Sequence, residues 1–182
     1  GLLKEQNMNY WTARVNRGTN PETKRRGRPN IQLSVIIPTL NAAATLEAAI
    51  VPLVANPRLV DEVIVVDGGS VDDTSRLAIR NGSRLVFAEQ GRGQQLGAGA
   101  VAAKGDWLLF LHADTVLSEG WAGAIEDHIT SQNAAHTAAV FRFALASAST
   151  AARRLEATVA WRTKWLGLPY GDQGLLISRM LY

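Results

Sequence analysis

The sequence predicts an α/β fold, with an open, mostly parallel sheet and helices on both of its faces. Two observations lead to this class. Short runs rich in valine, isoleucine and leucine alternate with stretches of helical pattern about 10 to 15 residues long, which is typical of right-handed β–α–β units. The apolar runs are also continuous instead of alternating with polar residues, as expected when helices cover both faces of a sheet.

The expected elements follow one another in a regular order. The first strand lies within 31–41, where Pro38 stops a β-branched run. The second strand begins at 61 and runs into Asp67 and a Gly–Gly turn. The helix expected over 41–54 contains Pro52, which should kink or end it. The remaining elements are strands over 83–89, 106–114 and 175–178 and helices over 72–82, 91–105 and 119–133.

Length and composition indicate one globular domain. The 182 residues suffice for a sizeable core, and 47% hydrophobic with 19% charged residues excludes a disordered chain. No apolar run reaches the roughly 18 residues of a membrane-spanning helix, and the first residues lack the apolar centre of a signal peptide. The absence of cysteine excludes disulfides and thiolate metal sites, so we expect a cytoplasmic protein.

Positive charge is concentrated near the N-terminus. Residues 1–30 carry seven Lys and Arg and two Glu, a net charge of +5, whereas 31–182 carry 12 basic and 14 acidic residues, a net charge of −2. A nucleic-acid-binding domain should carry its positive charge on the folded body, so we expect no nucleic-acid partner. We interpret 1–30 as a basic, flexible extension and 31–182 as the folded domain. Peripheral contact with the inner face of a membrane stays open.

Polar clusters follow three of the expected strands. In an open parallel α/β sheet, ligands bind outside the carboxyl ends of the strands, so the topology should bring these clusters to one edge. A carboxylate after the second strand suits hydrogen bonding to a base or ribose. A carboxylate after the fourth strand suits a hard divalent cation on a diphosphate. The clusters are Thr39-Leu40-Asn41, Asp67-Gly68-Gly69-Ser70 and His112-Ala113-Asp114-Thr115.

Two common nucleotide-binding signatures are absent. The P-loop pattern G-x-x-x-x-G-K-[ST] does not occur, which argues against a P-loop NTPase. The segment "GRGQQLGAG" (91–99) is rich in glycine, but no register of it gives G-x-G-x-x-G. A dinucleotide-dependent enzyme is therefore a poor interpretation.

Four motifs in fixed order resemble the family 2 glycosyltransferases with the GT-A fold. They are "SVIIPTLNAAATL", "DEVIVVDGGSVDDT", "AAKGDWLLFLHADTVL" and "PYGDQGLLISR". Within that family they are similar to the bacterial subgroup called rSAM/selenodomain-associated transferase 2. The resemblance spans roughly 32–182. It implies a nucleotide-sugar donor, an unknown acceptor, a divalent cation (Mn²⁺ or Mg²⁺) and an inverting displacement at the anomeric carbon.

The resemblance also implies which residues contact the donor. Asp67 matches the aspartate that hydrogen-bonds the nucleotide base. His112-Ala113-Asp114 falls on the D-x-D motif, whose last aspartate helps to ligate the metal, although His112 replaces the first aspartate. Arg92 falls where a basic residue can approach the diphosphate. The implied donor-binding set is Pro38, Thr39, Asn41, Asp67, Ser70, Arg92, His112 and Asp114, with Asp114 as the metal ligand.

Asp172 is the candidate catalytic base. The family's acidic general-base motif, an E-D pair opening a late helix, would lie beyond "LLISRMLY", so we expect a domain truncated at its C-terminus that binds donor but transfers sugar poorly. Asp172 in "PYGDQG" is the only acid after Glu156 and precedes the last expected strand. The alternative is that this loop only shapes the donor and acceptor pocket.

Plainer roles stay open for several of these residues. Asp67 and Asp114 could cap a turn or a helix, and His112 could be a structural neighbour of the site. Asp72 fits the acidic N-terminus of the helix that follows it. We expect His128, on a helix with a polar face, to be solvated.

Two other functional classes compete with a glycosyltransferase. A nucleotidyltransferase would also use a metal at the edge of an α/β sheet, but it would normally carry a glycine-rich basic loop after the first strand. The segment "PTLNAAATL" has neither glycine nor a basic residue. The other class is a catalytically silent module that only binds nucleotide-sugars.

Overall fold

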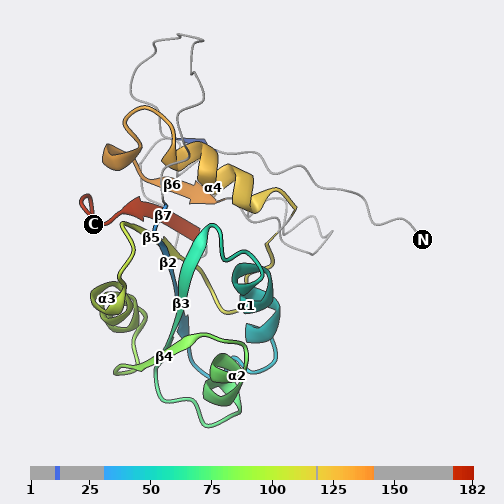
Figure 1. Ribbon diagram of the computed structural model, residues 1–182. Helices are drawn as coiled ribbons and strands as arrows, with labels where there is room; N and C mark the ends of the chain where they lie inside the picture. Colours follow the sequence, from blue (N-terminus) through green and yellow to red (C-terminus); the bar gives the residue numbers. More distant parts are fainter. Residues whose placement is uncertain (1–10, 13–30, 118, 142–173) are drawn as a thin grey trace, which may run out of the picture.

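The structure is a computed structural model that describes residues 11–12, 31–117, 119–141 and 174–182. These residues form a seven-stranded sheet with helices on both faces (Figure 1). In spatial order the strands are β1 (Trp11–Thr12), β6 (Ala139–Phe141), β7 (Gly174–Ser178), β5 (Trp107–Phe110), β2 (Leu33–Thr39), β3 (Val60–Asp67) and β4 (Arg84–Phe87).

The sheet has a parallel half and an antiparallel half. Strands β5, β2, β3 and β4 are parallel neighbours, whereas β7 pairs antiparallel with both β5 and β6, and β1 pairs antiparallel with β6. Five strands (β2, β3, β4, β5 and β6) therefore run in one direction, which confirms the expected mostly parallel sheet. The edge strand β1 comes from the segment 1–30, so two residues of that segment belong to the sheet.

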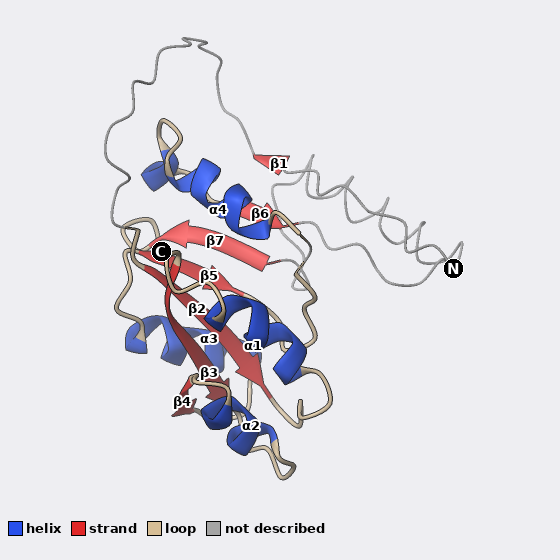
Figure 2. Cartoon of the chain, turned by 45° about the vertical axis from the view of Figure 1, so that its right-hand side comes forward, coloured by secondary structure: helices blue, strands red, loops and turns tan. Residues whose placement is uncertain are grey.

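Within the described part of the chain, four helices lie on the two faces of the sheet, as Figure 2 shows. They are α1 (Leu46–Val54), α2 (Thr74–Arg80), α3 (Arg92–Ala102) and α4 (Trp121–Ile129), and a 3₁₀ turn η1 (Ala134–His136) follows α4. Side chains of α1, α2 and α4 share one apolar core, and side chains of α3 form a second core on the other face. Among the described residues, no helix is long and apolar enough to cross a membrane.

The central strand β2 contributes to both cores. Val35 and Ile37 face α1, whereas Ile36 faces α3, and all three are fully buried. This two-sided burial is why the strand is continuously apolar.

Pro38 does not stop the first strand, contrary to expectation. Strand β2 continues to Thr39 in register with β3, but its pairing with β5 ends at Ile36 opposite Phe110. Pro38 therefore lies where β2 has lost one neighbour, and a residue without an N–H is tolerated at such an edge position. The strand expected over 106–114 is shorter, because β5 ends at Phe110 and the residues after Leu111 form a turn.

Helix α3 lies directly on β2 and β3. A Cβ atom on Gly99 would lie 2.4 Å from Cγ2 of Ile36 and 2.9 Å from Cγ2 of Val66. Only glycine permits this approach, because any side chain here would push the helix away from the sheet.

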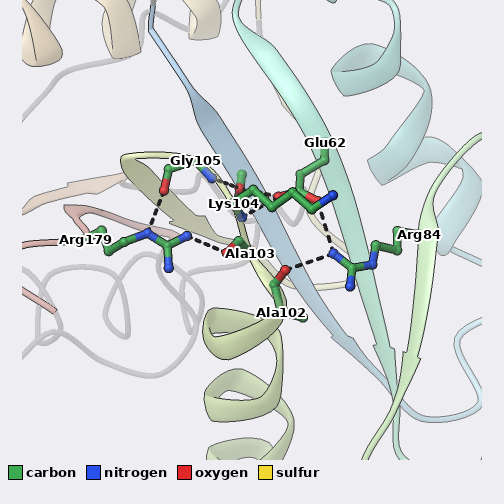
Figure 3. A network of polar contacts seen from close by, with 8 residues as sticks. Glu62, Arg84, Ala102, Ala103, Lys104, Gly105 and Arg179 are labelled. Atoms are coloured by element: carbon green, nitrogen blue, oxygen red, sulfur yellow. Dashed lines mark hydrogen bonds and ion pairs between the residues drawn. The ribbon is translucent and has the colours of Figure 1, made fainter.

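Two arginines hold the C-terminal end of α3 (Figure 3). Arg84 of β4 donates to the carbonyl of Ala102 at 2.8 Å. Arg179, just after β7, donates to the carbonyls of Ala103 at 2.6 Å and Gly105 at 2.9 Å. Cationic donors at a helix C-terminus satisfy carbonyls that have no helical partner and favour the helix dipole. The end of α3 is thus tied to both halves of the sheet.

Candidate functional site

The carboxyl ends of β2, β3 and β5 meet at one edge of the sheet, as the sequence predicted. Since these three strands are parallel neighbours, Thr39, Asp67 and the turn after Phe110 all emerge on the same side. The loops are also bonded to one another. The N–H of Gly68 donates to the carbonyl of Thr39 at 2.9 Å, and the N–H of Leu111 donates to the carbonyl of Ile36 at 3.0 Å.

Asp67 organises the loop that follows β3. Its side chain is 1% exposed. Ser70 donates its backbone N–H at 3.2 Å and its hydroxyl at 2.5 Å to the carboxylate. The hydroxyl of Ser75 donates to the other oxygen at 2.8 Å. Both oxygens of Asp67 are thus engaged within the protein, and a direct contact with a nucleobase stays a prediction.

Asn41 joins the loop after β2 to the loop after β3. Its backbone N–H donates to Oγ of Ser70 at 2.8 Å, and its side-chain oxygen accepts from the N–H of Val71 at 2.9 Å. Asn41 has a φ of 50°, a left-handed conformation that asparagine tolerates better than most residues. Ser70 therefore connects Asn41 to Asp67, and the three residues form one hydrogen-bonded unit.

Asp72 stabilises the same pair of loops from the start of α2. One carboxylate oxygen accepts from the N–H of Thr74 at 3.0 Å and from its hydroxyl, and the other accepts from the N–H of Ala43 at 3.0 Å. The hydrogen bond from the Thr74 side chain, supported by those backbone bonds, lowers the pKa of Asp72. The structure thus shows Asp72 bonded at the N-terminus of a helix.

The segment His112-Ala113-Asp114-Thr115 forms a closed turn. The N–H of His112 donates to Oγ1 of Thr115 at 3.1 Å, and the N–H of Thr115 donates back to the carbonyl of His112 at 3.2 Å. Thr115 is buried, whereas Asp114 is exposed. The turn thus presents the exposed carboxylate of Asp114 at the edge of the sheet.

Arg92 is the first residue of α3 and reaches the turn after β5. Its guanidinium contacts the imidazole of His112. Gly91, which precedes the helix, has a φ of +153°. The N-terminus of a helix favours anions through its N–H groups and its dipole, so Arg92 and the start of α3 form a cationic side of the site.

A divalent cation fits this edge of the sheet when a diphosphate is present. Among the described residues no three His, Asp or Glu side chains form a metal cluster. Mg²⁺ typically binds through one or two carboxylates together with substrate phosphates and waters. Asp114 provides such a carboxylate, and His112 lies two residues away.

Two expected site residues, Pro38 and Asp172, remain to be placed. Pro38 lies in β2 opposite Val66, and its cyclic side chain is half-buried. Asp172 lies outside the described residues. Ser75 and Gln95 were not predicted from the sequence. No local signal distinguishes Gln95, because an equally long polar residue, Gln94, precedes it.

His128 is not solvated, contrary to expectation. It is 8% exposed, and its ring meets that of Trp107 edge to face at a centroid distance of 5.9 Å. Burial lowers the pKa of His128, an effect that the Thr137 backbone partly offsets. The residue belongs to the core and not to the edge where the strands end.

Known proteins with a similar sequence are glycosyltransferases. Glucosyl-3-phosphoglycerate synthase of Mycobacterium tuberculosis (strain ATCC 25618 / H37Rv) is 41% identical over 96 residues, which cover 46% of this chain and 29% of that protein. The PGL/p-HBAD biosynthesis glycosyltransferase of Mycobacterium bovis (strain BCG / Pasteur 1173P2) is 41% identical over 95 residues, which cover 47% of this chain and 36% of that protein. The chain thus spans about a third of these relatives.

Solved structures extend the similarity to most of the described fold. A crystal structure of the M. tuberculosis glucosyl-3-phosphoglycerate synthase superposes with a TM-score of 0.63 at 26% identity, covering 84% of this chain and 59% of that one. A structure of the same synthase with Mn²⁺ and UDP-glucose gives a TM-score of 0.61 at 26% identity, covering 84% and 57%. These neighbours confirm the GT-A fold.

The family assignment comes from a match over most of the chain. Residues 34–173 match the family described as Glycosyl transferase family 2. This range runs from the second residue of β2 past β6 and includes the whole edge at which the polar loops meet. The chain therefore belongs to glycosyl transferase family 2.

Proposed function

We propose that this domain transfers a sugar from a UDP-sugar to an acceptor, with a divalent cation on the donor diphosphate. One observation carries the proposal. The ends of three adjacent parallel strands bring Asp67, the Asn41–Ser70 unit and the turn containing Asp114 to one edge, and Arg92 lies beside them. Solved relatives bound to UDP-glucose and Mn²⁺ support this choice of donor and cation.

Different residues bind different parts of the donor. The first turn of α3 and Arg92 bind the diphosphate, because cationic donors at a helix N-terminus match its charge. Asp114 ligates the cation, which neutralises charge on the leaving diphosphate when bound. The loop organised by Asp67 and Ser70 holds the nucleoside, and Thr39, Asn41 and Pro38 form the wall from β2. His112 orients the turn next to Arg92.

We further propose an inverting reaction and place the chain in the rSAM/selenodomain-associated transferase 2 subgroup, because His112 occupies the first position of the D-x-D motif as it does in that subgroup. Inversion requires a carboxylate that takes the proton of the acceptor hydroxyl. Asp172 is the proposed base. The matched relatives are named for different products, so the acceptor is left unassigned.

Binding and turnover assays test the proposal. Calorimetry with UDP-, GDP- and CDP-linked sugars, with and without Mn²⁺, should show binding of a UDP-sugar that requires the metal. Release of UDP, by hydrolysis or transfer, should follow. Binding without any UDP release would favour the silent module. Release of pyrophosphate from a nucleoside triphosphate and a sugar phosphate would favour the nucleotidyltransferase.

A further inference from the structure

Gln95 is a buried polar side chain that bonds to two strands at once. It lies on the first turn of α3 and is 5% exposed. Its amide nitrogen donates to the carbonyl of Thr39 at 2.8 Å and to the carbonyl of Val66 at 2.8 Å. Both N–H bonds of the amide group are thus used, and they connect a helix to the ends of β2 and β3.

The two carbonyls lie where β2 and β3 are about to separate. Pro38 pairs with Val66 and Thr39 with Asp67 in the last positions of the register. Beyond them the chain turns into the loops that carry Asn41 and Ser70. The carbonyl of Thr39 also accepts from the N–H of Gly68, so Gln95 completes the bonding at the branch point from which both loops start.

The same helix turn carries Arg92. Residues three apart on a helix are neighbours, so Gln95 lies beside Arg92, which contacts His112 in the turn after β5. The first turn of α3 thus connects to all three strand ends. The rest of α3 is held independently of Gln95, because Gly99 packs closely on the sheet and Arg84 and Arg179 bind carbonyls at the C-terminal end of the helix (Figure 3).

We propose that Gln95 is a positioning residue of the donor site. Its amide fixes the ends of β2 and β3 against α3 and thereby aligns the nucleoside loop with Arg92. This role rests on the proposed binding of a nucleoside diphosphate at this edge. Gln95 itself is buried beneath the loops and acts through Thr39, Val66 and Arg92.

Gly68 leaves the space that the Gln95 side chain occupies. A Cβ atom at position 68 would lie 3.0 Å from the side-chain nitrogen of Gln95 and 3.1 Å from its Cδ. Such contacts are tighter than ordinary van der Waals distances, so the Gln95 amide can reach both carbonyls undisturbed only because residue 68 has no side chain.

The first experiment compares Gln95→Met with Gln32→Met, a matched change at an exposed residue just before the opposite end of β2. Methionine keeps the length of glutamine but donates no hydrogen bond. We expect Gln95→Met to speed amide hydrogen exchange at Gly68 and to weaken UDP binding in Mn²⁺ about tenfold, as for the loss of hydrogen bonds to buried carbonyls. Gln32→Met should change neither. Affinities are measured well below each variant's Tm, so that only folded protein is compared.

The second experiment tests the complementarity of Gly68 and Gln95. Gly68→Ala should weaken UDP binding in the wild type, because the new methyl group displaces the Gln95 amide. In the background of Gln95→Ala the displaced atoms are absent, so Gly68→Ala should add little. Equal losses in both backgrounds would contradict the proposed contact.

The readouts separate this proposal from the proposed function. Unchanged amide exchange at Gly68 in Gln95→Met would show that the two Gln95 hydrogen bonds do not stabilise the ends of β2 and β3. Faster exchange with UDP affinity equal to that of Gln32→Met would overturn positioning and leave a structural role. If the wild type binds no UDP, the proposed function is wrong, and the donor-site role of Gln95 is wrong with it. The exchange result still decides whether Gln95 stabilises the ends of β2 and β3.

Discussion

Ser70 donates both its backbone N–H and its hydroxyl to the carboxylate of Asp67, three residues before it. The same hydroxyl oxygen accepts the N–H of Asn41. Asp67 therefore shapes the loops after β2 and β3 together, although it is buried beneath them. If a nucleoside binds at this edge, as proposed, the carboxylate of Asp67 can act on it through the loop or through a direct contact with the base.

Asp67→Asn separates these two roles. We expect UDP binding to weaken by about 1–3 kcal/mol, because the new NH₂ group faces a donor instead of accepting from one. If Asp67 accepts from the imino N–H of uracil, the variant should also lose its preference for UDP over CDP, since cytosine presents an acceptor at that atom. Calorimetry with both nucleotides measures the change.

Ser75→Ala is the control for Asp67→Asn. It removes one hydrogen bond to the Asp67 carboxylate and leaves the charge in place. A loss of UDP affinity in Ser75→Ala that matches the loss in Asp67→Asn, with the UDP-to-CDP ratio unchanged in both, would show that Asp67 acts only by organising the loop.

Asp114→Ala should abolish the gain in UDP affinity that Mn²⁺ provides, because a divalent ion on a diphosphate needs a hard oxygen ligand from the protein. Titrations with UDP in Mn²⁺ and in EDTA give the gain directly. Asp106→Ala is the control, since Asp106 is exposed and precedes the opposite end of β5. Retention of the full Mn²⁺-dependent gain in Asp114→Ala would contradict the metal assignment.

Arg92→Ala should weaken UDP binding by about 1.5–3 kcal/mol, the range for hydrogen bonds to charged groups. Uridine lacks the diphosphate, so its affinity should hardly change. Arg76→Ala removes an exposed arginine of α2 and serves as the control. Equal losses for UDP and uridine in Arg92→Ala would place the residue away from the diphosphate.

The sequence predicted the parallel half of the sheet and its functional edge for a clear physical reason. Strands buried on both faces must be continuously apolar, and right-handed crossovers place the carboxyl ends of parallel strands together. The positions of Thr39, Asp67 and Asp114 follow from these two rules. The antiparallel pairing of β1, β6 and β7 depends on contacts between segments far apart in sequence and was not predictable from local patterns.

The roles of some side chains depend on their surroundings in the fold and were not predicted from the sequence. In the sequence, Gln95 was only part of a glycine-rich segment that matches no nucleotide-binding motif. Its hydrogen bonds to the ends of β2 and β3 become visible only once α3 is packed on the sheet. His128 could have been recognised. Trp121, Ala124, Ile125 and His128 are the buried residues of α4, and their i, i+3, i+4, i+7 spacing is that of one apolar helix face.

Asp172→Asn should lower the rate of sugar transfer about 10²–10⁴-fold, the usual contribution of a general base, and leave the affinity for UDP unchanged. Asparagine keeps the size of the side chain and cannot accept the proton. A transfer assay with a labelled donor, run beside UDP titrations, distinguishes this role from pocket shaping. A loss of donor affinity in proportion to the loss of rate would favour pocket shaping.

The buried His128 should make the stability of the domain depend on pH. Burial lowers the pKa of His128 from its usual 6.5, so below about pH 6.5 the unfolded chain takes up a proton that the folded chain resists. The contribution to stability is therefore complete above pH 6.5. It declines as the pH falls, until the pH passes the lowered pKa of the folded state.

Thermal unfolding between pH 8 and pH 5 measures this dependence. In His128→Phe the group that titrates is gone while an aromatic ring still faces Trp107, so the decline of Tm below about pH 6.5 should become shallower. His136→Phe removes an exposed imidazole and should keep the decline of the wild type. If His128→Phe shows the same decline as His136→Phe, the proton is taken up elsewhere, and burial of His128 does not set the acid sensitivity of the fold.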